Sequence, residues 1–175
     1  MNTASFEATL AGGHPNSLGR TVEVVDTVLN SPERLAELYA CYFSDDEVVR
    51  LRTSNAIKRI SKARPDWLVP YLDGLLSDVA RLEQASAQWT LANLFETLEP
   101  YMTPEQKRRA KEVMKGNLEV YSDWIVLKNT AQALGAWAQD DEALKAWLEP
   151  HLERLSKDSR KAVARAARKQ RAALL

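Results

Sequence analysis

Apolar and small side chains recur along this chain at the spacing of one helix face. Helix positions i, i+4, i+7 and i+11 point the same way, so apolar residues at these offsets form a stripe that a neighbouring element can bury. Four such stripes start at Val49, Ala87, Val126 and Val163, and successive starts are 38, 39 and 37 residues apart. This even spacing predicts a structural repeat. The stripes are Val49, Thr53, Ala56 and Ile60; Ala87, Leu91, Leu94 and Leu98; Val126, Thr130, Ala133 and Trp137; and Val163, Ala167, Gln170 and Leu174.

The segments between the stripes are also amphipathic, so each repeat is predicted to contain two helices. Their apolar positions are Leu35, Leu38 and Tyr42; Leu72, Leu75, Leu76 and Val79; Ala110, Val113 and Met114; and Leu144, Leu148, Leu152 and Leu155. Trp67–Leu75 and Trp147–Leu155 share the pattern W-L-x-P-x-L-x-x-L, 80 residues apart, which supports the register because two repeats separate them. Pro70 and Pro150 are expected near the first turn of their helices, where a missing N–H costs least, or at a kink.

A fifth stripe lies 31 residues before the first and has no helix ahead of it; its members are Leu18, Val22, Val25 and Leu29. Together the patterns predict an all-α fold, an α-α superhelix of about four helix pairs preceded by one unpaired N-terminal helix. A length of 175 residues suits one domain. We place that domain at residues 17–175, after a flexible N-terminal segment, residues 1–16.

Helix-start signals agree with this register. Ser44 with Glu47, and Thr103 with Gln106, have the spacing of a capping box, and Pro104 occupies an expected first helical position. These signals predict that one helix begins just after Ser44, ahead of the Val49 stripe, and that another begins at Pro104.

Residues Asp45–Ile60 resemble the second helix of a HEAT repeat. The family pattern is an Asp, then Val-Arg, then a small residue and aliphatics, which here are Asp45, Val49, Arg50, Ala56, Ile57 and Ile60. The third repeat keeps Asp123 and Val126 but has Leu127 where the Arg would stand, and the second and fourth depart further. With the stripes in register, the likeness covers about residues 17–175. It implies a right-handed superhelix whose second helices line a concave surface.

Charge and cysteine content limit the classes of partner and compartment. Lys+Arg and Asp+Glu are 24 each, but residues 1–100 carry 9 basic and 14 acidic side chains, and residues 101–175 carry 15 and 10. The C-terminal half, at +5, is therefore the part suited to an anionic partner. Cys41 is the single cysteine, which excludes an intrachain disulfide. No basic start with an apolar run and no apolar stretch of membrane-spanning length is present, so we expect a cytoplasmic protein with no membrane partner.

The residues that could carry catalysis are few. The two histidines are His14 in a glycine-rich segment and His151 in a predicted helix, and neither has partners at metal-ligand spacing. Cys41 lies in the apolar stretch LYACYF, where we expect a buried thiol rather than a reactive one. We therefore expect no enzyme activity, no cofactor and no metal.

Residues Gly13–Thr21 share glycines and a final basic–hydroxyl pair with phosphate-binding loops. The spacing has one residue too many, Arg20 replaces the lysine, and no strand precedes the segment. The sequence favours a loop in which Asn16 or Ser17 caps the first helix. Its free N–H groups could still hold an anion.

Two tryptophans stand off the apolar stripes of their helices. Trp89 and Trp124 are therefore candidates for a groove, and Asp123 adjoins the second of them. This set is similar in kind to the groove of HEAT-like DNA alkylation-repair glycosylases, which hold damaged DNA in a basic concave surface lined by aromatics and a carboxylate. The chain is short for that group, and its motifs do not match residue by residue.

The last predicted helix is strongly basic. From Lys157 to Arg171 there are seven basic residues and one acidic residue. Four of them are expected to share a face that could follow phosphates; they are Lys161, Arg165, Arg168 and Lys169. The sequence favours a different interpretation, a solvated cap that ends the solenoid, with Gln170 interrupting the apolar stripe.

Two functional hypotheses follow. The first is a non-catalytic interaction module that binds an unidentified protein or peptide on its concave face, because helical solenoids offer large preformed surfaces and few deep polar pockets. The second is nucleic-acid binding through the basic C-terminal half, with or without glycosylase activity. An anion-binding regulator using the Gly13–Thr21 loop, and an enzyme of another kind, are the remaining alternatives.

Overall fold

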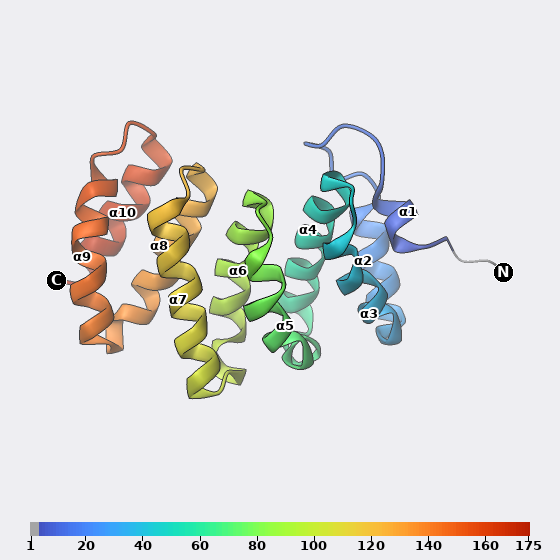
Figure 1. Ribbon diagram of the computed structural model, residues 1–175, viewed down its shortest axis with the longest axis horizontal. Coiled ribbons are helices and arrows are strands. Elements are labelled where there is room, and N and C mark those ends of the chain that lie inside the picture. The colour runs from blue at the N-terminus through green and yellow to red at the C-terminus, as the bar shows by residue number, and fades with distance from the viewer. Residues whose placement is uncertain (1–3) are drawn as a thin grey trace.

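The structure, a computed structural model, describes residues 4–175, and within this range the chain is helical and contains no strand (Figure 1). This confirms the predicted all-α class. The α-helices are α1 (Phe6–Leu10), α2 (Thr21–Asn30), α3 (Leu35–Ala40), α4 (Glu47–Ala63), α5 (Leu72–Ser77), α6 (Ala85–Leu98), α7 (Pro104–Val120), α8 (Trp124–Trp137), α9 (Glu142–Ser156) and α10 (Lys161–Ala173). Short 3-10 helices adjoin them at Pro32–Arg34, Cys41–Phe43, Pro65–Tyr71, Val79–Arg81, Glu99–Tyr101 and Ala138–Asp140.

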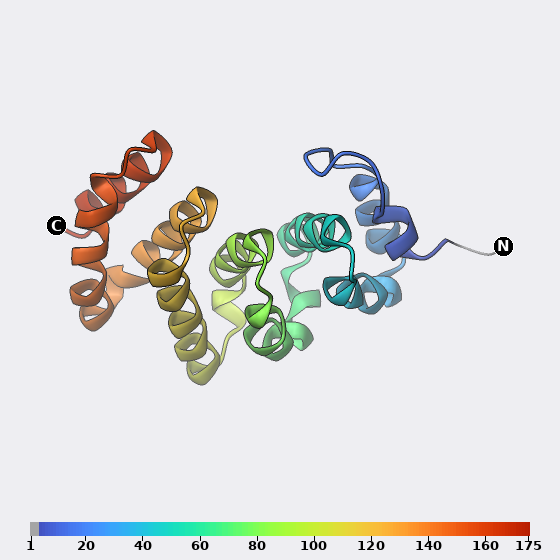
Figure 2. The same ribbon diagram turned by 45° about the horizontal axis from the view of Figure 1, so that its top comes forward.

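The helices form two layers that wind into a superhelix. The even-numbered helices make one layer, in which α2, α4, α6, α8 and α10 each pack on the next. Helices α3, α5, α7 and α9 cover the other side and connect successive members of the first layer. In Figure 2 the even-numbered helices form the upper row, which curves so that its two ends lie above its middle. The even-numbered helices therefore line the concave face, and the predicted α-α superhelix is confirmed.

Burial of the four stripes holds the layers together. Val49, Ala56 and Ile60 of the first stripe are fully buried, and the second and third stripes are buried throughout. The odd-numbered helices contribute fully buried leucines such as Leu75 and Leu148 from the other side. Each such side chain contributes roughly 1.5–3 kcal/mol through removal from water. The fourth stripe is interrupted at Gln170, which is half-buried.

The predicted stripe of the N-terminal helix is wrong in register. Leu18 precedes α2 and is 42% exposed, and Val22 is 45% exposed. The buried residues of α2 are Thr21, Val24, Val25 and Val28. The run VEVV satisfies two helical registers, and contact with α1 and α4 selects the one that the stripe did not follow.

The N-terminal helix is also not unpaired. Helix α1 packs against α2, α3 and α4, and its Phe6 and Leu10 are buried. The amide N–H of Phe6 donates to Glu37 Oε1 at 2.8 Å, which ties α1 to α3. The packed domain therefore begins at α1 rather than at residue 17, and the predicted flexible segment 1–16 is wrong for residues 6–10. Residues 1–3 of that segment lie outside the described residues.

One of the two predicted capping boxes forms. Thr103 and Gln106 make both reciprocal bonds at the start of α7, with Pro104 at its first position. At α4 the N-cap is Asp46, whose carboxylate accepts from Val48 N at 2.8 Å. Ser44 lies outside the helix and donates its hydroxyl to Glu7 Oε1 at 2.6 Å, so it connects α1 to the chain before α4.

The two prolines of the shared W-L-x-P motif have different settings. Pro70 lies in the 3-10 helix Pro65–Tyr71, which precedes α5, whereas Pro150 lies well inside α9. The second position is farther from a helix start than predicted. None of the helices in residues 4–175 is long and apolar enough to cross a membrane.

Candidate functional site

Equivalent positions of the even-numbered helices form two rows along the concave face. At 3.6 residues per turn, positions two and six residues after a stripe start lie about 200° and 240° around the helix, opposite its buried side. In each of α4, α6, α8 and α10 these positions are half-buried or exposed. The first row is Leu51, Trp89, Lys128 and Arg165, and the second is Asn55, Asn93, Gln132 and Lys169. We call these eight residues the concave rows.

The chemistry of the concave rows changes from one end to the other. At α4 and α6 the rows carry Leu51, Trp89 and two asparagines, which are apolar or neutral. At α8 and α10 they carry Lys128, Arg165 and Lys169, and none of these three pairs with an acidic side chain of the described chain. The concave rows are therefore neutral at α4 and α6 and positively charged at α8 and α10.

A pocket of about 230 Å³ opens at the neutral end of the concave rows. We call it the rim pocket. Leu51 and Asn55 of α4, together with Trp89 of α6, contribute to one side of its lining, and the loop between α1 and α2 contributes to the other. Its lining residues are Pro15, Asn16, Ser17, Leu18, Leu51, Arg52, Asn55 and Trp89. The pocket is largely apolar, with amide and hydroxyl groups among its lining, which is typical of sites that take a side chain.

Arg52 holds the loop that forms one wall of the rim pocket. It is only 2% exposed, and its guanidinium makes four hydrogen bonds to main-chain carbonyls of residues 10–17. Nη1 donates to the carbonyls of Leu10 and Gly12, each at 2.6 Å, and Nε and Nη2 donate to those of Ser17 and His14, each at 3.2 Å. No acidic side chain in residues 4–175 forms an ion pair with it. Carbonyl dipoles therefore compensate a buried charge.

The sequence did not identify Arg52 as a functional or structural residue. It follows Val49 by three positions, which places it at the edge of the apolar stripe rather than opposite to it. A charged residue at the edge of an apolar stripe was the sequence signal that could have identified Arg52. Its partners lie 35 to 42 residues earlier, so no local pattern could name them.

The loop itself is not arranged as a phosphate cradle. It turns its carbonyls toward Arg52, and several of its amides are already bonded within the loop. The N–H groups of Asn16, Ser17 and Gly19 donate to His14 Nδ1, His14 O and Ser17 Oγ respectively. Helix α2 begins after Arg20, and neither Asn16 nor Ser17 caps it, so that prediction is wrong.

Asp123 and Trp124, two of the predicted groove residues, lie at the start of α8 in different settings. Asp123 is the N-cap of α8, and its Oδ1 accepts from Ile125 N at 2.8 Å and from Val126 N at 3.0 Å. Its carboxylate is therefore engaged by the helix N-terminus. Trp124 is the first residue of α8 and is 44% exposed. Trp89, the third of this set, lies in the wall of the rim pocket.

The four basic candidates of α10 do not form one patch. Arg165 and Lys169 belong to the concave rows. Arg168 takes the position that Ser54, Ala92 and Ala131 occupy in the earlier repeats, where the next even-numbered helix buries it. Within the described residues no helix packs over this position of α10, and Arg168 is exposed and donates to Ser156 O at 2.9 Å.

Lys161, Arg165 and Arg168 nevertheless meet around one shallow pocket of about 430 Å³ at the start of α10. Asp158 shares this pocket, and Arg160 holds the pKa of that carboxyl at about 2, mainly through a side-chain hydrogen bond. Lys169 is not among the lining residues. The C-terminal end thus carries a charged surface that continues from the concave face onto the open end.

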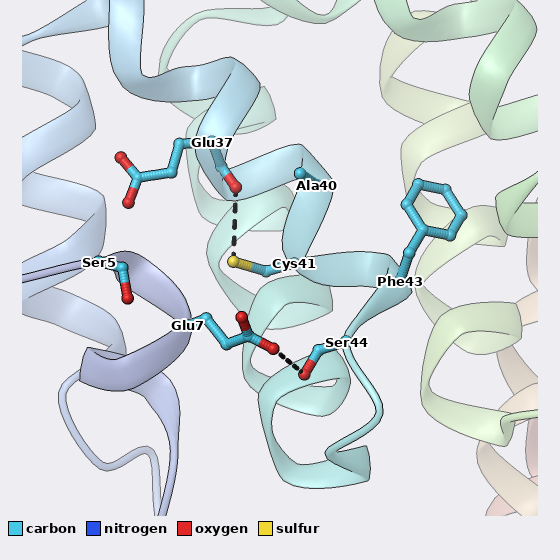
Figure 3. Close-up of a pocket in the computed structure, with 7 residues that line it drawn as sticks. All are labelled: Ser5, Glu7, Glu37, Ala40, Cys41, Phe43 and Ser44. Atoms are coloured by element: carbon cyan, nitrogen blue, oxygen red, sulfur yellow. Dashed lines mark hydrogen bonds between the residues drawn. The ribbon is translucent and has the colours of Figure 1, made fainter.

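Cys41 is buried between α1 and α3, and its thiol donates to Glu37 O at 3.4 Å (Figure 3). The carboxylates of Glu7 and Glu37 line the same pocket, while the ring of Phe43 points away from the thiol. Burial, assisted by the charges of Glu7 and Glu37, raises the pKa of Cys41 to about 11. The thiol is therefore protonated near neutral pH and is not activated as a nucleophile.

The reactivity of Cys41 provides a direct check. A pKa of about 11 in place of 9.0 leaves about a hundredth as much thiolate at pH 8, and the higher intrinsic nucleophilicity recovers only part of this loss. We expect native protein to react with iodoacetamide at least ~10-fold more slowly than urea-unfolded protein at pH 8. Mass spectrometry of the alkylated chain measures both rates. Equal rates would contradict a buried, protonated Cys41.

His151 also has a structural setting. Its ring stacks on Trp147 at 4.2 Å between centroids, and burial together with nearby Arg154 lowers its pKa. In the described part of the chain, no group of three or more His, Cys, Asp or Glu side chains is placed to hold a metal ion.

Comparison with known proteins gives the fold and no more. No family model matches the chain, and no curated protein matches it. Among solved structures it is similar to the crystal structure of an engineered protein, with a TM-score of 0.66 and 14% sequence identity over 97% of this chain and 79% of that chain. At this identity the similarity supports the shared helical architecture alone.

Proposed function

We propose that this protein is a non-catalytic binding module, a HEAT-like solenoid whose concave face holds a protein or an extended peptide. One observation carries the proposal: the concave rows place apolar, amide and basic side chains at equivalent positions of the four neighbouring helices α4, α6, α8 and α10. Such a periodic surface can contact an elongated partner at regular intervals. A single deep polar site would instead favour a small molecule.

The side chains in the rows suit a polypeptide partner. Asparagine and glutamine amides both donate and accept hydrogen bonds, as peptide groups do. The molecule also contains an internal example, because Arg52 binds a non-helical stretch of the same chain through its carbonyl oxygens. Trp89 adds a large apolar surface of the kind that dominates binding energies at interfaces.

The proposal assigns no chemical step to the protein. The thiol of Cys41 is buried and protonated, His151 stacks on Trp147, and the carboxylate of Asp123 caps α8. The last point also weakens the comparison with alkylation-repair glycosylases, because that arrangement needs a carboxylate free to face the groove.

Nucleic-acid binding is the second candidate. It is favoured by Lys128, Arg165 and Lys169, which lie on the concave face without acidic partners in residues 4–175. Phosphates could follow these side chains, and the resulting affinity would fall steeply with salt.

A binding experiment with two arms separates the candidates. A random 12-residue peptide library displayed on phage is selected on the wild-type protein, and enriched peptides are synthesised with a fluorescein label. We expect Trp89→Ala to weaken their binding at least ~10-fold, because the side chain is central to the surface. Arg108→Ala changes an exposed residue of α7, in the other layer, and is expected to leave binding unchanged.

The second arm uses a fluorescein-labelled 20-base-pair DNA duplex at low and physiological salt. Failure to enrich any peptide that depends on Trp89, together with salt-dependent DNA binding lost in Arg165→Glu, would replace the peptide proposal by the nucleic-acid one. Absence of both would overturn the concave face as a binding surface.

A further inference from the structure

The concave face carries an uneven charge distribution that restricts its partner. At the N-terminal end, α2 exposes Glu23 and Asp26 on the side opposite its buried residues. Glu23 pairs with Arg20, whereas Asp26 has no cationic partner within the described residues. At the other end, Lys128, Arg165 and Lys169 form no ion pair within residues 4–175. A uniformly anionic ligand lying along the whole face would meet repulsion at α2 and attraction at α8 and α10.

The rim pocket lies between these two ends. Its wall residues Leu18, Leu51 and Trp89 present apolar surface. Leu18 precedes α2 and is exposed rather than packed in the core. Arg52 fixes the loop wall through its four carbonyl bonds, so the pocket is preformed. A preformed apolar pocket beside a solvated row of amides is suited to one apolar side chain of a longer ligand.

The spacing of the helices then sets the spacing of the ligand. Packed helices lie about 8–10 Å apart, and an extended peptide advances about 3.3 Å per residue. One helix-to-helix step along the concave face therefore corresponds to about three peptide residues. A peptide anchored beside Trp89 on α6 reaches Lys128 on α8 after about three residues and Arg165 on α10 after about six.

We propose that the rim pocket takes an apolar side chain of an extended peptide whose acidic residues, three and six positions to one side, pair with Lys128 and with Arg165 and Lys169. This inference rests on the proposed function and specifies its partner as an acidic peptide with an apolar anchor. The opposite end of the peptide, which lies near Asp26, carries no acidic residue.

The test is a comparison of peptide selections on three proteins. The random 12-residue library is selected on the wild type, on the charge-swapped variant Arg165→Glu/Lys169→Glu, and on Arg108→Glu. The last variant reverses an exposed charge of α7, in the other layer and away from the concave rows. All three changes are at exposed positions, and far-UV circular dichroism verifies that the helix content is retained.

We expect peptides enriched on the wild type and on Arg108→Glu to share an apolar residue with acidic residues three and six positions away. On the charge-swapped variant the residue at position six is expected to become basic. For a synthesised peptide, replacing one acidic residue by serine is expected to weaken binding about 3-fold. The charge-swapped variant is expected to weaken the original peptide about 10-fold and to recover affinity for the peptide with the reversed charge.

Peptides that lack the acidic spacing, or a selection that the charge swap does not alter, would overturn this inference. If such peptides still lose binding in Trp89→Ala, the proposed function stands and the acidic motif alone is rejected. If no peptide depends on Trp89, the proposed function fails, and binding of the DNA duplex through Arg165 assigns the face to nucleic acid.

Discussion

Replacing Arg52 by alanine is expected to lower the free energy of unfolding by about 3 kcal/mol. The guanidinium is buried and donates to the carbonyls of Leu10, Gly12, His14 and Ser17. Hydrogen bonds from charged groups are stronger than neutral ones, and their removal leaves the carbonyl of Leu10 buried without this partner. Part of the loss is recovered when the loop separates from α4 and its carbonyls bind water, which keeps the expected value near the lower end of the range for buried charges.

Urea unfolding followed by circular dichroism measures this loss. Arg52→Lys keeps the charge but cannot supply a planar fork of donors to four carbonyls, so it is expected to be destabilised as well. Arg59→Ala is the matched control, because Arg59 is an exposed residue of the same helix that bonds only Asn55. Its expected effect is within about 0.5 kcal/mol. An Arg52→Ala protein as stable as the Arg59→Ala protein would contradict the role given to Arg52.

The same substitution connects stability to binding. The loop held by Arg52 forms one wall of the rim pocket, whereas Trp89 and Leu51 on the other side belong to long helices. Loss of the Arg52 hydrogen bonds is therefore expected to affect the loop first, because the loop adjoins α1, a five-residue helix that packs mainly on α2, α3 and α4. The binding surface and the N-terminal end of the core thus depend on one side chain.

The repeat and its core were predictable from sequence because they depend on local periodicity. A stripe at i, i+4, i+7 and i+11 fixes which side of a helix is buried, whatever element buries it. Val49, Ala87 and Val126 accordingly lie in the core as predicted. Trp89 was identified by the same logic in reverse, since a large aromatic off the stripe lies on the opposite side of its helix and here lines the rim pocket.

The N-terminal end could not be predicted in the same way. Helix α1 has five residues, which is too short for a periodic signal, and it is held by tertiary contacts such as Phe6 N to Glu37. The hydrogen bonds of Arg52 join residues up to 42 positions apart. The division of the α10 basic residues between two surfaces depends on which sides of α10 other helices cover, and the helix pattern alone does not define this.

Gly74→Ala is expected to lower the free energy of unfolding by about 2 kcal/mol, although alanine is the better helix former. A Cβ at this position in α5 would overlap the hydroxyl of Tyr39 and lie 3.2 Å from its Cζ. The Tyr39 ring cannot move away easily, because it packs against Tyr42, Phe43 and Tyr71, with the nearest centroid at 4.7 Å. Overpacking a fixed aromatic ring therefore outweighs the gain in helix propensity. Urea unfolding of the wild type and of Gly74→Ala measures the difference in their free energies of unfolding.

Two further variants isolate the cause. Tyr39→Phe removes a buried hydroxyl that has no hydrogen-bond partner in the described structure, so Gly74→Ala combined with Tyr39→Phe is expected to regain most of the lost stability. Gly116→Ala is the matched control in α7, where a Cβ meets nothing within 4 Å. It is expected to raise the free energy of unfolding by about 0.5–1 kcal/mol, because only the helix-propensity gain remains. Equal effects at the two glycines, or a double variant no more stable than Gly74→Ala, would show that contact with Tyr39 is not what requires glycine at position 74.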